Sequence, residues 1–165
     1  MATTDIHWPD DMTPDVASFH AVNQLQIDAP REHVWEWLRR PELWPTYYGN
    51  CWLVKHHGGP WPAAEAGTRF RWVTFGLVVQ SEIVECSALD GRFAWSAKEV
   101  GAKGHHEWVL SDRDGGTFVH TEETQRGWSV APIAPVMRRL MTRYHQRWLE
   151  GLAQVAAQGP PPAVA

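Results

Sequence analysis

Hydrophobic and polar residues alternate along much of the chain, with the period of two that is typical of half-buried β-strands. In the segment FHAVNQLQI, for example, Phe19, Ala21, Leu25 and Ile27 fall on one face, and polar residues fall mainly on the other. Turns that contain glycine or aspartate separate most of the later segments, as in a meander of antiparallel hairpins. We therefore expect strands at residues 19–27, 51–57, 68–75, 77–86, 91–98, 105–111 and 117–126.

Helical spacing replaces this alternation in two parts of the chain. After the first strand, Pro30 suits the first turn of a helix, and Val34, Trp35 and Leu38 then share one helical face. The segment PELWPTYYG fits a second, shorter helical turn. Apolar residues recur in steps of three and four from residue 136 to residue 155, which predicts one long amphipathic helix.

This order of elements predicts an α+β fold, in which the long helix lies against one face of a curved antiparallel sheet. A length of 165 residues is typical of a single domain. We expect an irregular arm at residues 1–17, the folded domain at 18–157 and a disordered, proline-rich tail at 158–165.

Tryptophan is far more frequent than in an average protein. The chain has 11 tryptophans, whereas a typical usage of roughly 1% would give about two. Each indole buries a large area and usually needs a partner for its N–H group. A solid core of so many rings is hard to pack at native density. We therefore expect some of the rings to line a cavity or a surface.

Charge and composition exclude several partners. The net charge is −4, from 15 basic and 19 acidic residues, and no basic run indicates a nucleic-acid partner. No stretch approaches the 18 apolar residues of a membrane span, so we expect no stable membrane insertion. The acidic N-terminus lacks the apolar core of a signal peptide, which predicts a cytoplasmic location. Cys51 and Cys86 form no disulfide framework, although a single pair stays open.

Several segments resemble the helix-grip superfamily, also called START-like or SRPBCC. They are the motif I-x-A-P-x-x-x-V-W-x-x-L from Ile27 to Leu38, the β-meander, GGTFVHTEE from Gly115 to Glu123, and the terminal amphipathic helix. The resemblance covers roughly residues 18–157 and includes polyketide cyclase/dehydrase and pollen-allergen-type proteins. It implies an apolar cavity between the sheet and the long helix, usually for a small hydrophobic ligand. It implies no particular chemistry, because one fold hosts many functions.

The resemblance and the tryptophan excess together give a set of expected ligand contacts. The segment WPTYYGNCW is expected to close one end of the cavity, and RGWSVAPIAPV to form its entrance, with two methionines below it. Three further tryptophans share strand faces with apolar residues. The expected ligand-binding residues are Trp44, Tyr48, Trp52, Trp72, Trp95, Trp108, Trp128, Met137 and Met141.

Two titratable residues are candidates for acid–base catalysis. His106 shares a strand face with Trp108, and a resemblance-based orientation that places Val119 toward the cavity brings Glu123 with it. A buried carboxylate among aromatic rings could serve as an acid or a base. The alternatives stay open: a core histidine bonded to a carbonyl, a solvated glutamate at the rim, or a shift of one residue that would give the role to Glu122.

No cofactor or metal is expected from sequence motifs. The pairs His56–His57 and His105–His106 are strand neighbours that point to opposite faces, and no HExxH or CxxC motif is present. No phosphate-binding loop is present either. The arginines at 69 and 71 are expected to point outward, although the reverse orientation would put them in the pocket, where they could bind a carboxylate or an enolate.

Three functions remain after these exclusions. The first is a carrier or sensor that binds a small hydrophobic, aromatic or polycyclic molecule. The second is a cofactor-free enzyme of the polyketide cyclase/dehydrase type, in which Glu123 or His106 moves a proton. The third is a protein-interaction module like the co-chaperone members of the superfamily. The sequence leaves the oligomeric state open.

Overall fold

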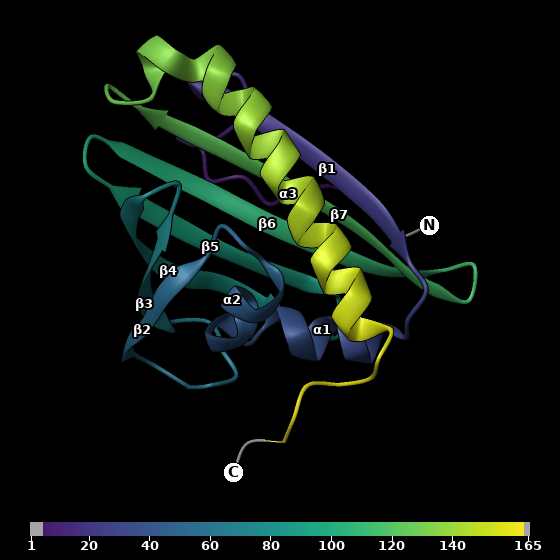
Figure 1. Cartoon of the computed structure of the whole chain (residues 1–165). Helices are drawn as coiled ribbons and strands as arrows, with labels where there is room; N and C mark the ends of the chain where they lie inside the picture. The colour runs from purple at the N-terminus through teal and green to yellow at the C-terminus, as the bar shows by residue number, and fades with distance from the viewer. Residues whose placement is uncertain (1–4, 164–165) are drawn as a thin grey trace.

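The computed structural model describes residues 5–163 as one curved antiparallel sheet with a long helix on one of its faces (Figure 1). The seven strands follow the order β1-β7-β6-β5-β4-β3-β2, so the first strand pairs with the last. The strands are β1 (Phe19–Ile27), β2 (Trp52–Gly58), β3 (Arg69–Thr74), β4 (Leu77–Ser87), β5 (Arg92–Glu99), β6 (Ala102–Arg113) and β7 (Gly116–Gly127). The α+β fold class and the strand order along the chain are those that the sequence predicts.

The three α-helices occupy the predicted places, and two short 3₁₀ turns accompany them. They are α1 (Arg31–Leu38), a 3₁₀ turn η1 (Pro41–Leu43), α2 (Trp44–Tyr47), a second 3₁₀ turn η2 (Ala131–Ile133) and α3 (Ala134–Ala156). Figure 1 shows α3 crossing the sheet, with α1 and α2 near its C-terminal end. No helix among residues 5–163 is long and apolar enough to cross a membrane.

A cluster of tryptophans fills the space between the sheet, α2 and the C-terminal half of α3. Trp148 is the centre of this aromatic core, because its ring lies 5.0 Å from that of Trp44 and 5.1 Å from that of Trp108. Trp95 adds a fourth ring, 5.1 Å from Trp44. The indole N–H of Trp44 donates to the carbonyl of Leu38 at 2.8 Å, which satisfies its buried polar group. Part of the tryptophan excess is therefore solid core.

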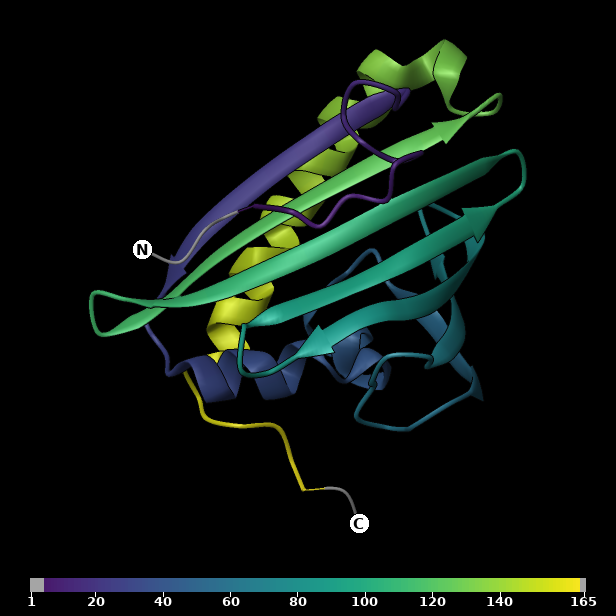
Figure 2. The same cartoon turned by 180° about the vertical axis from the view of Figure 1, so that it is seen from behind.

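The N-terminal arm, residues 5–17, lies across the face of the sheet opposite α3 (Figure 2). The ring of Trp8 packs edge-on against His20 and His105, and the hydroxyl of Thr124 donates to the carbonyl of Met12 at 2.7 Å. These contacts cover polar groups on the outer face of the sheet.

Two further expectations concern the chain end and the cysteines. At the other end of the chain, the indole N–H of Trp37 donates to the carbonyl of Gly159 at 2.8 Å, so the start of the predicted tail contacts α1. Cys51 and Cys86 are both free thiols, which closes the alternative of a disulfide.

Candidate functional site

A cavity of about 340 Å³ opens between the sheet and the N-terminal half of α3. Its walls come from β3 to β7, from the segment after β7, and from α3. Most of the lining side chains are apolar or aromatic, and they are Tyr48, Trp72, Phe75, Leu77, Val79, Trp95, Ala97, Val100, Trp128, Val130, Ile133, Met137, Met141 and Trp148. The few polar lining groups include two carboxylates, an amide and an imidazole.

The aromatic wall is held in place by hydrogen bonds and stacking. Tyr48 stacks on Trp148, with ring centroids 4.2 Å apart and planes 5° apart. Its hydroxyl accepts from Asn50 at 3.1 Å. The indole N–H of Trp72 donates to Ser81 at 3.1 Å. Because these rings already have polar partners, they present their apolar faces to the cavity.

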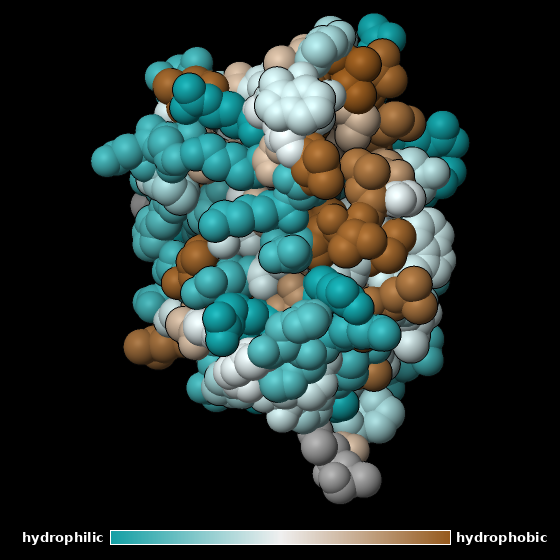
Figure 3. Space-filling model, turned by 90° about the vertical axis from the view of Figure 1, so that its left-hand side faces the viewer, coloured by the Kyte–Doolittle hydropathy of each residue, from teal (hydrophilic) through white to brown (hydrophobic). Residues whose placement is uncertain are grey.

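The rim of the cavity carries large exposed apolar side chains. Trp128 is 75% exposed and Val100 is 86% exposed, yet both line the cavity, as do the exposed Leu77 and Ile133. They come from the hairpin tips and from the start of the helical segment. Figure 3 shows hydrophobic side chains gathered in a band on this side of the molecule. An apolar rim of this kind is typical of a binding or entrance surface.

Glu123, His106 and His145 form a buried polar cluster that reaches the cavity wall through Glu123 and His145. The register of the β6–β7 hairpin places His106 directly opposite Glu123. Atom Nδ1 of His106 lies 3.0 Å from Oε2 of Glu123, and Nε2 of His145 lies 3.2 Å from the same oxygen. The two imidazole rings are stacked with centroids 4.5 Å apart. Side chains from β6 and α3 therefore converge on one carboxylate oxygen of β7.

Two neighbouring side chains orient this cluster. The amide of Gln125 donates to Oε1 of Glu123 at 2.7 Å, which leaves Oε2 for the histidines. Nε2 of His106 lies 2.8 Å from the hydroxyl of Thr121, which itself donates to the carbonyl of Glu107 at 2.8 Å. Such partners fix both the rotamer of the carboxylate and the orientation of the ring.

Burial and charge shift the pKa values of Glu123 and His106, both downward. Burial alone would raise the pKa of Glu123, but the two imidazoles outweigh it and hold that pKa well below its usual range. Burial lowers the pKa of His106 to about 4, although the charge of Glu123 acts in the opposite direction.

Comparison with known proteins assigns the chain to a family. Residues 18–157 match the family model described as polyketide cyclase / dehydrase and lipid transport. The chain belongs to this family. No curated protein matches the sequence significantly.

Solved structures of low sequence identity share the helix-grip fold. The chain is similar to the hypothetical protein jhp0584 from Helicobacter pylori, with a TM-score of 0.85 and 24% identity over 94% of this chain and 98% of that one. It is similar to Ara h 8.0201, with a TM-score of 0.69 and 13% identity over 85% and 98% of the two chains. The di-domain ARO/CYC StfQ from the steffimycin biosynthetic pathway gives a TM-score of 0.69 and 12% identity, over 84% of this chain and 51% of that one.

The structure separates the expected ligand contacts into two groups. The residues that line the cavity are Tyr48, Trp72, Trp95, Trp128, Met137 and Met141, together with Glu123. Trp44 and Trp108 belong instead to the aromatic core, and His106 lies behind Glu123. Trp52 is 46% exposed, because it lies opposite Val73, which shares the outer face of β3 with Arg71. Contact of any of them with a ligand stays a prediction.

The sequence interpretation missed His145 and Gln125. His145 lies four residues after Met141, so the two share a helix face, and this spacing is a signal that could have identified it. Gln125 lies two residues after Glu123 and therefore on the same strand face. Glu122 points to the opposite face, where it contacts His20 and His120, so the orientation that brings Glu123 to the cavity side is the one observed.

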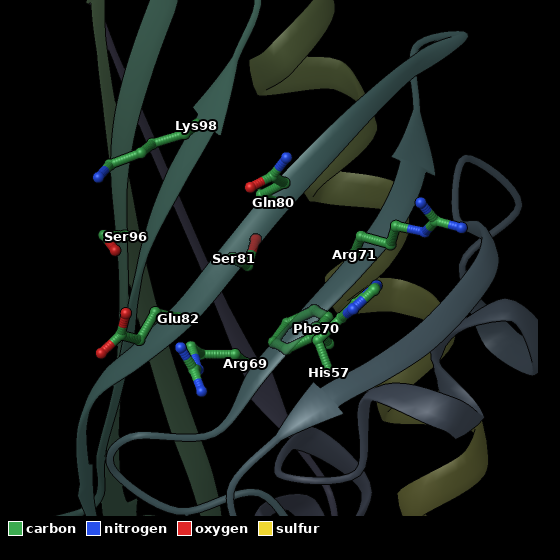
Figure 4. A pocket seen from close by; sticks show the side chains of 9 residues that line it. All are labelled: His57, Arg69, Phe70, Arg71, Gln80, Ser81, Glu82, Ser96 and Lys98. Atoms are coloured by element: carbon green, nitrogen blue, oxygen red, sulfur yellow. The ribbon is translucent and has the colours of Figure 1, made fainter.

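A second hollow, of about 440 Å³, lies over β3, β4 and β5 (Figure 4). Its polar lining includes Arg69, Arg71, Glu82 and Lys98, which confirms that the two arginines point outward. In Figure 4 the ends of Arg71 and Lys98 point in opposite directions. The basic groups thus spread over a surface and do not converge on one point, as an anion site would require.

Proposed function

We propose that this protein binds a small, largely apolar molecule with aromatic or polycyclic character in the cavity under α3. The observation that carries the proposal is the wall of the cavity, in which Tyr48, Trp72, Trp95 and Trp148 present rings around an enclosed space. Apolar burial supplies the binding free energy, at roughly 25 cal/mol per Å² before the cost of ordering the ligand. The family description, which includes lipid transport, supports the same class of ligand.

The volume limits the size of the ligand. An apolar cavity of about 150 Å³ accommodates one benzene ring. The cavity here has about 340 Å³, which corresponds to a molecule of two or three rings. Met137 and Met141 lie on the helical wall, and their flexible thioethers can adapt to rings of different shape.

Polar groups on the wall of the cavity orient the ligand. Burial raises the pKa of Tyr48 well above its usual value, so its hydroxyl stays protonated and can donate to a ligand oxygen. Glu123 and His145 form a second polar position on the wall. A ligand with one or two oxygen atoms on an aromatic skeleton fits this distribution.

The first experiment identifies the molecule that the protein carries. We would extract the purified protein under denaturing conditions and identify bound compounds by mass spectrometry. We would then titrate 2-naphthol and anthraquinone, as two- and three-ring probes, while following tryptophan fluorescence. Saturable quenching is expected, because Trp72, Trp95 and Trp148 line the cavity.

A cavity-filling variant makes this test specific. Ala97→Phe places a ring inside the cavity and is expected to remove saturable quenching. Ser96→Phe is the matched control, because the neighbouring side chain lines the outer hollow shown in Figure 4 and should leave binding intact. If Ala97→Phe binds the probes as tightly as Ser96→Phe and the wild type do, the ligand binds elsewhere and the proposal is wrong.

A cofactor-free enzyme of the polyketide cyclase/dehydrase type is the second candidate. The observation in its favour is that a carboxylate, Glu123, and an imidazole, His145, lie on the wall of the cavity that would fold the substrate. These are the residue types that move protons in such reactions. His106, behind the carboxylate, would act through Glu123.

The two candidates differ in what happens to the bound molecule. With a poly-β-ketone thioester as substrate, the enzyme candidate predicts a cyclised product, and Glu123→Gln and His106→Ala each bind substrate without turnover. Recovery of unchanged ligand from the wild-type protein supports a carrier. If both variants turn over substrate as fast as the wild type does, neither residue takes part in the reaction.

A further inference from the structure

The histidine–glutamate cluster has the geometry of a metal site. One ligand atom each from His106, Glu123 and His145 lies within 4.8 Å of the other two. Two ligands of one ion at about 2.0–2.1 Å lie about 2.9–3.4 Å apart in octahedral or tetrahedral coordination. The distances from Oε2 of Glu123, 3.0 Å to His106 and 3.2 Å to His145, fall in this range.

The hydrogen bonds around His106 leave room for either a proton or a metal ion between the ring and the carboxylate. A carbonyl oxygen only accepts, so the single hydrogen of the Thr121 hydroxyl is used in its bond to the carbonyl of Glu107. Thr121 must then accept from Nε2 of His106, which places a proton on that nitrogen. In a neutral ring Nδ1 therefore carries a lone pair, and it faces a carboxylate oxygen 3.0 Å away. Two lone pairs at this distance repel, so either a proton or a metal ion must lie between them.

We propose that His106, Glu123 and His145 bind one divalent transition-metal ion at the wall of the cavity. Two imidazoles and one carboxylate are the ligand set of several catalytic zinc sites and of the facial triad that holds ferrous iron. Nδ1 of His145 has no hydrogen-bond partner among residues 5–163. This nitrogen is therefore free to carry the ring proton, which leaves the lone pair of Nε2 for the ion. This inference does not depend on whether the cavity ligand is transformed.

Neighbouring side chains support two of the three ligands in the way that is typical of metal sites. Thr121 holds the far nitrogen of His106, and Gln125 holds the second oxygen of Glu123. An ion can reach the ligands through the cavity, because Glu123 and His145 lie on its wall. Coordination positions that the protein does not fill would face that space, where an oxygen atom of a cavity ligand can occupy one.

Two other histidine–glutamate groups serve as internal comparisons. On the outer face of the sheet, His20 and His120 contact Glu122 through its two different oxygens, Oε2 and Oε1. Their nitrogens therefore do not converge on one point. In the arm, His7 approaches Glu85 and Glu107, but His7 is exposed and Glu107 is already paired with Arg92.

The experiment uses the full chain without a histidine tag, stripped with a chelator and titrated with Zn²⁺ by calorimetry. One ion per chain is expected. Glu123→Gln and His145→Gln should each abolish saturable binding, because each removes a ligand. Thr121→Val should weaken binding roughly 10- to 100-fold, as for other residues that position a metal-binding histidine. Glu122→Gln and Glu85→Gln are the matched controls and should bind as the wild type does.

A spectroscopic measurement locates the ion independently of stability. Co²⁺ should give a visible absorption band typical of nitrogen and oxygen ligands. It should also quench tryptophan emission, since the ring of Trp95 lies 4.5 Å from that of His106. Far-ultraviolet circular dichroism of each variant checks that it is folded.

The outcomes distinguish a bound metal ion from a proton on His106. If His106 is an imidazolium, a proton takes the place of the ion, and neither Zn²⁺ nor Co²⁺ binds to the wild type. That result, or binding that survives Glu123→Gln and His145→Gln, overturns the proposal. Loss of binding only in Glu122→Gln or Glu85→Gln also overturns it, because it moves the ion to the outer face.

Discussion

Oε2 of Glu123, near the end of β7, lies 3.2 Å from Nε2 of His145, in the middle of α3. This contact joins the sheet to the long helix at the wall of the cavity. The two residues are far apart in sequence, and only the packing of α3 across the sheet brings them together. The site therefore depends on the helix–sheet spacing, which the aromatic core sets.

The first prediction separates core tryptophans from cavity tryptophans. Trp108 is fully buried in the aromatic core and does not line the cavity. We expect Trp108→Leu to lower the free energy of unfolding by about 3 kcal/mol, because it removes most of a ring from a packed core. Ligand affinity should change by less than about twofold, since the cavity wall keeps its atoms. Urea unfolding and a fluorescence titration measure the two effects. A large loss of affinity at unchanged stability would contradict this assignment.

The fold was predictable from the sequence, because alternation and helical spacing report directly on burial. Phe70 and Trp72 in β3 alternate with two exposed arginines, and the structure buries both rings as expected. The lining of the cavity was only partly predictable. Trp44 and Trp52 lie in one short segment, yet one is in the core and the other is half-exposed. Trp52 pairs with Val73 on the outer face of the sheet, and the residue pattern does not show this pairing.

The polar cluster was half predictable for a similar reason. Residues of one hairpin can be paired by strand parity, which brings His106 and Glu123 together. His145 comes from an element that packs against this hairpin in three dimensions. Its position depends on the rotation of α3 about its own axis, and the apolar stripe defines that rotation only coarsely.

The second prediction tests the contact between α3 and α2. Gly151 packs so closely on α2 that a Cβ at this position would collide with the carbonyl oxygen of Tyr47. Alanine usually stabilises a helix by about 1 kcal/mol relative to glycine. We expect the opposite sign for Gly151→Ala, a loss of about 1–3 kcal/mol, because the clash with backbone forces the two helices apart. Glu150→Ala, one residue away and exposed, should change stability little. Greater stability of Gly151→Ala in urea unfolding would show that the two helices do not touch there.

The third prediction concerns the pH dependence of stability. Glu122 is partly buried, which opposes ionisation, but hydrogen bonds from His120 and His20 lower its pKa from 4.5 to about 2. A carboxyl whose pKa is lower in the folded state stabilises the fold above its unfolded pKa. This contribution is lost as the pH falls from 4.5 towards 2.

Glu122→Gln isolates this contribution. The wild type should be more stable than the variant at about pH 6, and its advantage should shrink by about pH 3. Urea unfolding at the two pH values measures the difference. An advantage that is constant or larger in acid would mean that Glu122 has no lowered pKa in the folded protein.

The last prediction compares two tryptophans on opposite sides of the sheet. Trp8, in the N-terminal arm, packs against His20 and His105 on the outer face, whereas Trp128 is an exposed residue of the cavity rim. Trp8→Ala should cost about 1–2 kcal/mol of stability, because it removes two aromatic contacts and uncovers buried polar groups. It should leave ligand affinity unchanged.

Trp128→Ala should have the reverse effect, with stability within about 0.5 kcal/mol of the wild type and slower ligand association. Stopped-flow fluorescence with 2-naphthol measures the association rate, and hydrogen exchange of β6 and β7 reports whether the arm still covers the outer face. Because each variant acts on one side of the sheet, a loss of stability and slower association in the same variant would show that the two faces are coupled.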